Sequence, residues 1–124
     1  MAGTVTCVEE RLGSIYKIKW TWVSSAGGAA DGVTTYPYTG EIVRVVQIPD
    51  SGGTAPTTLY DVVVTDSDGA DALVGLGADL SIAANTSKTT KDGLGAVANT
   101  ALTLAVTNAG SGKGGKTILY VKAR

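Results

Sequence analysis

Histidine and phenylalanine are absent from this 124-residue chain, and cysteine occurs once, as Cys7. Without histidine the chain cannot form a Ser-His-Asp triad, a Cys-His pair or a histidine metal site. A single cysteine excludes an intrachain disulfide, a zinc ribbon and a CxxC redox pair. We therefore expect a protein that is not an enzyme and that carries no cofactor.

Charge is also scarce, and it is nearly balanced. The chain has 10 basic and 11 acidic residues, which make up 17% of it and give a net charge of -1 at pH 7. This balance supplies no overall field that would attract nucleic acid or an anionic membrane. No apolar run approaches the about 18 residues of a membrane-spanning helix. Residues 1–6 have neither the basic nor the apolar region of a signal peptide. We expect a protein that is made in the cytosol and binds neither nucleic acid nor a membrane.

The chain is rich in glycine, threonine, alanine and valine, and its β-branched residues favour strands over helices. The clearest strand covers residues 14–23, where Tyr16, Ile18, Trp20 and Trp22 alternate with polar residues. This period of two indicates a strand with one buried face. Further strands are predicted over residues 33–36, 41–48, 59–65, 101–107 and 117–122, with turns at 37–40 and 66–69.

These segments predict an all-β fold, in which residues 1–124 form a single domain. We expect an antiparallel sandwich or small barrel of about six to seven strands. The last two predicted strands flank the glycine-rich residues 110–115 and are expected to pair as a hairpin. Long loops rich in glycine, alanine and serine connect the strands, and residues 72–76 or 79–84 hold at most a short helical turn. Residues 1–12 are expected to form an N-terminal arm or an edge strand.

One ion pair is predicted between two of these strands. Asp61 precedes a run of valines, and Arg44 interrupts the apolar run over residues 41–48. A carboxylate buried beside valines needs a partner. We therefore expect Asp61 to pair with Arg44 if the two strands adjoin.

Residues 110–117, with the sequence GSGKGGKT, match the P-loop pattern GxxxxGK[ST]. A P-loop needs a strand before the glycines and a helix after them, because the helix N-terminus and backbone amides hold the phosphates. Only seven residues follow Thr117, and residues 118–121 are strand formers. We therefore interpret the segment as a loop between strands.

Residues 66–71 resemble a calcium-binding loop, because three carboxylates at close spacing could surround a hard cation. The glycine at position 69 and the glycine at position 77 do not fit the EF-hand pattern. A β-turn capped by aspartate explains the segment equally well. We predict no metal site, with Asp66, Asp68 and Asp71 as weak candidate ligands.

Several side chains are candidates for contact with a partner. Tyr16, Trp20 and Trp22 could stack on a sugar, but a chain without phenylalanine needs such rings, of about 150–250 Å² each, for its core or for a subunit interface. Tyr36 and Tyr38 flank a proline at a predicted turn, so we expect them to be exposed. The candidates for partner contact are Val5, Cys7, Tyr36, Tyr38, Trp20 and Trp22.

Two further groups have plain structural interpretations. Cys7 is expected to be a small buried apolar residue, since no activating group lies near it in the sequence. Six cations could form a basic face if the strand over residues 14–23 lies near the C-terminal strands, although we expect them to be ordinary solvated side chains. They are Lys17, Lys19, Lys113, Lys116, Lys122 and Arg124.

The order of strands and turns over residues 35 to 122 is distinctive. It combines a valine-rich strand, a Pro-Asp turn with a glycine-rich loop, a second valine-rich strand, an acidic turn, and two closing strands. The stretches in question are residues 40–46, 49–50, 55–57, 59–66, 68–71, 73–77, 99–110 and 117–120.

This pattern resembles small virion structural proteins of tailed bacteriophages. The resemblance implies a β-rich subunit of the virion, and a capsid decoration (cement) protein in the first place. Its partners would be the major capsid protein and copies of itself, as a trimer or a dimer. A tail, neck or head-fibre component and a host-surface or carbohydrate-binding β module are the alternatives.

Overall fold

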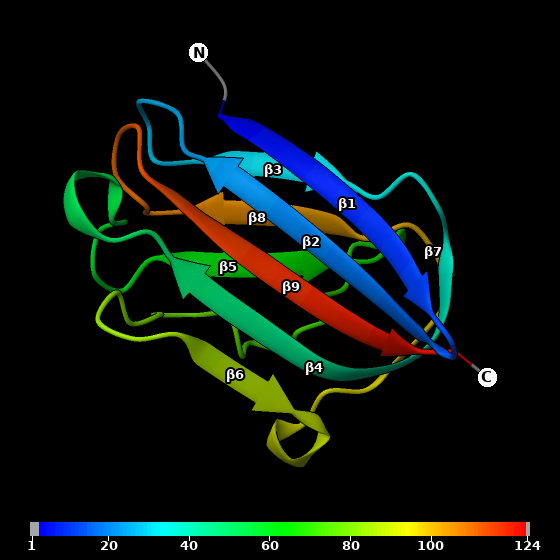
Figure 1. The fold of residues 1–124 in the computed structure, drawn as a ribbon. Helices are drawn as coiled ribbons and strands as arrows, with labels where there is room; N and C mark the ends of the chain where they lie inside the picture. The colour runs from blue at the N-terminus through cyan, green and yellow to red at the C-terminus, as the bar shows by residue number, and fades with distance from the viewer. Residues whose placement is uncertain (1–2, 124) are drawn as a thin grey trace.

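Two antiparallel β-sheets make up the fold of residues 3–123, which are the residues that this computed structural model describes (Figure 1). The larger sheet has six strands in the order β1-β2-β9-β4-β6, and β7 also pairs with β4. The smaller sheet has three strands in the order β3-β8-β5. The strands are β1 (Thr4–Leu12), β2 (Ile15–Val23), β3 (Ala30–Val33), β4 (Tyr38–Pro49), β5 (Asp61–Thr65), β6 (Thr86–Thr89), β7 (Ala96–Thr100), β8 (Thr103–Thr107) and β9 (Gly114–Lys122).

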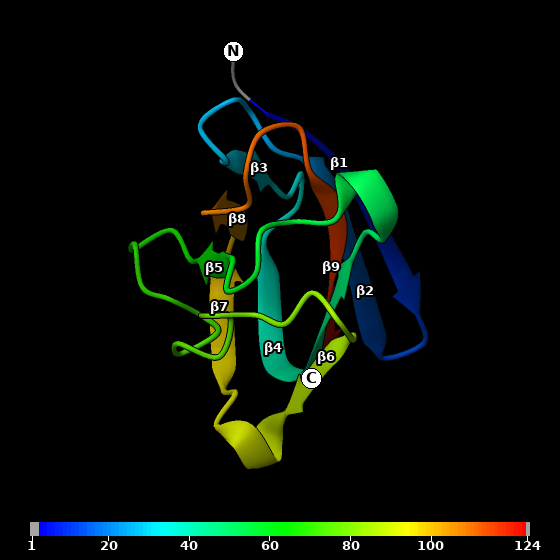
Figure 2. The same cartoon turned by 90° about the vertical axis from the view of Figure 1, so that its left-hand side faces the viewer.

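The prediction of an all-β antiparallel fold is confirmed, and the two sheets pack face to face as a sandwich whose larger sheet curls (Figure 2). Residues 3–123 form nine strands, more than the number predicted, because short strands at β6 and β7 pair with β4. The strand predicted over residues 33–36 lies earlier, as β3. The helical segments of the described residues are two single 3₁₀ turns, η1 (Gly52–Thr54) and η2 (Thr90–Asp92).

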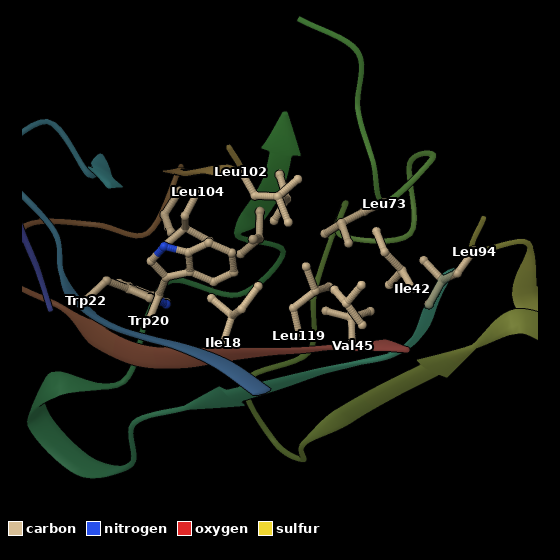
Figure 3. Packing of buried hydrophobic residues seen from close by; sticks show 14 of the residues in the cluster. Ile18, Trp20, Trp22, Ile42, Val45, Leu73, Leu94, Leu102, Leu104 and Leu119 are labelled. Carbon is tan, nitrogen blue, oxygen red and sulfur yellow. The ribbon is translucent and has the colours of Figure 1, made fainter. Parts of the chain in front are cut away.

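The inward face of β2 forms the centre of the core, as its alternation predicts. Ile18, Trp20 and Trp22 are buried there, and Leu104 and Leu119 are buried with them, from β8 and β9 (Figure 3). A two-residue turn joins β2 to β1, so that the two strands pair along their whole lengths.

The predicted hairpin between residues 101–107 and 117–122 is wrong, because β8 and β9 belong to different sheets. The connection that contains the glycines crosses from the smaller sheet to the larger one. There β9 lies between β2 and β4, and most of its residues are buried. Its run of apolar residues on both faces suits this central position.

The turn predicted over residues 37–40 is also wrong, because β4 already begins at Tyr38. Gly40 lies beside a β-bulge with a φ of 152°, and a Cβ atom there would collide with the carbonyl of Lys122. Glycine therefore lets the start of β4 approach β9 closely and continue into a pairing with β7.

Residues 66–85 cover the space between the two sheets on the side of β5. They form consecutive turns, in agreement with the expectation of at most a short helical turn, and Leu73 and Leu80 insert from them into the core. Backbone hydrogen bonds fix this segment against β5, including the one that the N–H of Val62 donates to the carbonyl of Gly77. A segment without regular secondary structure that is held in place by such hydrogen bonds cannot be recognised from a local sequence pattern.

Candidate functional site

A surface pocket of about 320 Å³ lies where the β1–β2 hairpin meets the connection from β3 to β4. Three consecutive residues of the edge strand β1 line it, together with one residue of β2 and three around the start of β4. The lining residues are Glu9, Glu10, Arg11, Tyr16, Tyr36, Pro37 and Tyr38.

Glu9 holds the two sides of this pocket together. Its Oε2 accepts the N–H of Thr35 at 2.9 Å, and its Oε1 accepts the N–H of Tyr36 at 3.2 Å and the hydroxyl of Tyr38 at 2.6 Å. In β1, Val5, Cys7 and Glu9 alternate on the inward side, so the carboxylate points toward the connection from β3. One side chain thus fixes the backbone that carries the exposed Tyr36.

The protonation states of this pair follow from its contacts. Burial raises the pKa of Glu9, but the hydrogen bonds from Tyr38, Thr35 and Tyr36 outweigh burial, and its pKa lies below the ordinary value. Burial and the bond to Glu9 raise the pKa of Tyr38 well above its ordinary value. At neutral pH the carboxylate is ionised and the phenol is protonated, so this bond acts as a structural clamp.

Aromatic contacts make one wall of the pocket rigid. The rings of Tyr16 and Tyr38 meet edge to face with their centroids 5.1 Å apart, and the Arg11 guanidinium lies 5.2 Å from the centroid of Tyr16. Arg11 also donates from Nε to the carbonyl of Gly13. Such a half-open pocket with a charged rim can accept an apolar or aromatic side chain of a partner.

The residues predicted for partner contact have different positions. Tyr36 is 61% exposed, as expected, whereas Tyr38 is buried, because it belongs to β4 and bonds to Glu9. The expectation of an exposed Tyr38 is therefore wrong. Val5 and Cys7 are half-buried on the inward side of β1.

Trp20 and Trp22 are not available to a partner or a sugar. Both are core residues, with 0% and 1% of their surface exposed, and Trp22 packs against Tyr60 (Figure 3). Tyr16 lies beside them at the pocket and is half-buried. The structure therefore confirms that the tryptophans belong to the core, and it contradicts their alternative role as contacts for a partner.

Cys7 is half-buried and packs against the core. Burial raises the pKa of its thiol to about 11, and the charge of Glu9 and a weak hydrogen bond from Sγ to Oε2 of Glu9 raise it as well. A thiol in this setting is a poor nucleophile at neutral pH.

Two of the three carboxylates of residues 66–71 accept hydrogen bonds from nearby backbone N–H groups. Asp66 accepts the N–H groups of Asp68 and Ala70, and Asp71 accepts those of Leu73 and Gly75. Within residues 3–123 the structure has no group of three His, Cys, Asp or Glu side chains that could hold a metal ion. The positive φ of Gly69 suits the predicted β-turn.

The residues that match the P-loop pattern do not have P-loop geometry. Lys116 and Thr117 belong to β9, so a strand follows the glycines where a phosphate site needs a helix. The hydroxyl of Thr117 is buried and donates to Oε1 of Gln47 at 2.6 Å. Lys113 donates to the carbonyl of Gly53.

The predicted pair of Arg44 and Asp61 does not form, because β4 and β5 lie in different sheets. Arg44 donates to the hydroxyl of Ser87 and lies over the ring of Tyr120. Asp61 accepts hydrogen bonds from the backbone of Asp79 and the side chain of Asn108.

The sequence predicted a possible basic face if the strand over residues 14–23 lay near the C-terminal strands. The pairing of β2 with β9 meets this condition and brings four of the lysines together. Lys17, Lys19, Lys116 and Lys122 lie on the outward side of the larger sheet, and Arg44 joins them from β4. Lys113 precedes β9 and is not on this face. Arg124 lies outside the described residues.

Glu9 is a residue of this pocket that the sequence analysis does not predict. The signal was present, because an acidic residue continues the inward-facing series of Val5 and Cys7. Its partners could not be found in the same way, since they depend on β1 meeting the connection between β3 and β4.

No family model, curated protein or solved structure matches the chain. Among the residues that the structure describes, no helical segment has the length and apolar character that a membrane span requires.

Proposed function

We propose that this chain is a non-enzymatic structural protein of a tailed-bacteriophage virion. In this role it is a capsid decoration protein, which binds the outer surface of the major capsid protein lattice and stabilises the head. The strands β4, β5, β8 and β9 include residues 40–46, 61–65, 103–107 and 117–120 of the segments that resemble phage virion proteins. The all-β fold is compatible with this role.

The edge strand β1 is the observation that carries the proposal. It has nine residues, and within the described part of the chain it pairs with a strand on one side only, namely β2. Its first five residues, Thr4–Val8, are uncharged and rich in β-branched side chains. A long edge of this kind is a template for strand addition, and a neighbouring capsid subunit could supply the added strand.

The other outer edge of the larger sheet is protected by comparison. Two short strands that pair with β4 form it, β6 with four residues, including Lys88, and β7 with five, and the 3₁₀ turn η2 follows β6 at once. Short and charged edges resist strand addition. The pocket beside β1 adds a second contact point, where the exposed Tyr36 and Arg11 could receive a side chain of the same partner.

Binding to isolated heads tests the proposal. The chain is mixed with heads of the phage whose genome carries it, before and after expansion, and the heads are then sedimented. We expect binding to expanded heads and a rise in their thermal stability. Heads that neither bind the chain nor melt at a higher temperature would contradict the proposal, as would a source genome without phage head genes.

Two matched substitutions test the part played by β1. Val8 and Val23 are 43% and 47% exposed, but Val8 lies on the free edge and Val23 lies on β2. Val8→Lys should weaken binding to heads about tenfold, because a lysine on an edge opposes strand addition. Val23→Lys should weaken binding to heads much less. If the two variants weakened binding equally, β1 would not be part of the interface.

A host-surface or carbohydrate-binding module is the second candidate, and the pocket with its three tyrosines favours it. Binding to a glycan array that Tyr36→Ala abolishes, without binding to heads, would support it. Leu59→Ala is the matched control, because Leu59 is also exposed and lies outside the pocket.

A further inference from the structure

Charge is divided between the two outward faces of the sandwich. The outward face of the larger sheet, which we call the basic face, carries five cations and two acids among the described residues. The acids, Glu10 and Glu41, are cross-strand partners of Lys17 and Lys122. The cations are Lys17, Lys19, Arg44, Lys116 and Lys122.

The smaller sheet has the opposite character. Asp31 and Asp61 lie on its outward side, on β3 and β5. The uncharged residues Val63 and Ala105 are cross-strand partners at the centre of this side. Residues 45–87 contain six aspartates and no lysine or arginine. Of these, Asp66, Asp68, Asp71 and Asp79 lie in the segment that follows β5.

This segment extends from the side of the smaller sheet, away from the basic face (Figure 2). We call the outward side of the smaller sheet, together with residues 66–79, the acidic face. The net charge of -1 for the whole chain conceals the separation, because positive and negative groups lie on opposite sides of one small protein.

Both faces also offer apolar surface. On the basic face Ile15, Ile48 and Tyr120 are half-buried. On the acidic face Val33 and Val74 are each 57% exposed. Complementary charge around apolar contacts is the arrangement that steers two protein surfaces together and fixes their orientation.

We propose that the basic face of one copy of this chain binds the acidic face of a second copy. The contact is heterologous, so a pair of copies keeps one free basic face and one free acidic face, and the assembly closes into a ring or grows as a filament. The proposal does not depend on the chain being a decoration protein, since both faces belong to the same molecule.

A nucleic acid fits the basic face less well than a second copy does. Sequence-independent binding of a single strand uses several aromatic rings as stacking platforms. Tyr120 is the one aromatic residue of this face in the described chain, and the Arg44 guanidinium already lies 5.7 Å from the centroid of its ring. The acidic face would also repel a polyanion.

Sedimentation velocity over a range of protein concentrations gives the first test. At low salt the average mass should rise with concentration, and at about 1 M salt, where the screening length is about 3 Å, it should fall to that of the monomer. Lys116→Glu should weaken association at least tenfold. Lys91→Glu makes the same charge change at an exposed lysine of η2, off the basic face, and should have little effect.

Mixing two variants tests the heterologous geometry. The variant Lys19→Glu/Lys116→Glu removes the excess of positive charge from the basic face and leaves the acidic face intact. The variant Asp31→Lys/Asp68→Lys lowers the excess of negative charge on the acidic face from six to two and leaves the basic face intact. Asp31 and Asp68 are exposed, so both substitutions are compatible with the fold. Each variant alone should be monomeric, and an equimolar mixture should associate. Circular dichroism of each variant checks that it is folded.

Three outcomes would overturn the proposal. The wild-type chain could stay monomeric at every concentration and salt. The mixture of the two folded variants could fail to associate. The monomeric chain could instead bind an oligothymidine strand in a salt-sensitive manner that Lys19→Glu/Lys116→Glu abolishes, and the basic face would then be a polyanion site.

Discussion

The hydroxyl of Tyr38 donates a 2.6 Å hydrogen bond to the carboxylate of Glu9, although the two residues are 29 positions apart in the chain. This bond joins the edge strand β1 to the first residue of β4. The same carboxylate also accepts two backbone N–H groups of the connection between β3 and β4. The wall of the pocket and the position of Tyr36 both depend on this arrangement.

Replacement of Glu9 should therefore destabilise the protein. In Glu9→Gln the negative charge is lost, and an NH₂ group replaces one of the two acceptor oxygens. At least one of the groups that donate to Glu9 then loses its acceptor. We expect the free energy of unfolding to fall by about 1–3 kcal/mol, as measured by urea denaturation. Glu10→Gln is the control, because Glu10 is exposed on the opposite side of β1, and its change should stay within about 0.5 kcal/mol. Equal losses in the two variants would contradict the role of Glu9.

The contribution of Glu9 should also depend on pH. Burial raises its pKa, but the hydrogen bonds from Tyr38, Thr35 and Tyr36 lower it further, so the folded chain has a pKa below the ordinary value of 4.5. The stabilisation is then fully present above about pH 4.5 and is lost as the pH falls through the folded-state pKa. The difference in unfolding free energy between the wild type and Glu9→Gln should shrink on acidification. A difference that stays constant down to about pH 3 would contradict this linkage.

Cys7 should react slowly with thiol reagents. Burial and the charge of Glu9 raise its pKa from 9.0 to about 11. The thiolate fraction at pH 8 is then about 100-fold lower than for an unperturbed thiol, because two pKa units separate them. The rate of alkylation by iodoacetamide should be lower by at least this factor in the folded chain than in the urea-unfolded chain. Glu9→Gln should raise the folded-state rate, since it removes the nearby negative charge.

Residues 66–85 should contribute to stability through Leu73. This side chain is fully buried, whereas its neighbour Val74 is 57% exposed. Leu73→Ala should lower the free energy of unfolding by about 2–5 kcal/mol, because it leaves a cavity in the core. Val74→Ala should change it by less than about 0.5 kcal/mol. A small loss for Leu73→Ala would show that the segment adjusts freely over the core.

The strands with strong alternation or dense β-branched residues could be predicted from the sequence. The strand β2 is the clearest case, and the buried positions of Ile18, Trp20 and Trp22 follow from a period of two. The short strands β6 and β7 could not be predicted in this way. Most of their residues are polar or small and show no clear alternation. They become strands because they pair with the backbone of β4, which lies far away in the sequence.

The sequence by itself determined that this chain forms an antiparallel β protein with its tryptophans on one strand face, because alternation is a local property. Only the tertiary structure decided which strand belongs to which sheet, since pairing depends on residues far apart in the chain. Three features follow from those pairings. They are the placement of β8 and β9 in different sheets, the hydrogen bond between Glu9 and Tyr38, and the separation of charge onto two faces. The lack of histidine and the single cysteine exclude catalytic triads, histidine metal sites and intrachain disulfides. The arrangement of the sheets defined the surfaces that remain for binding.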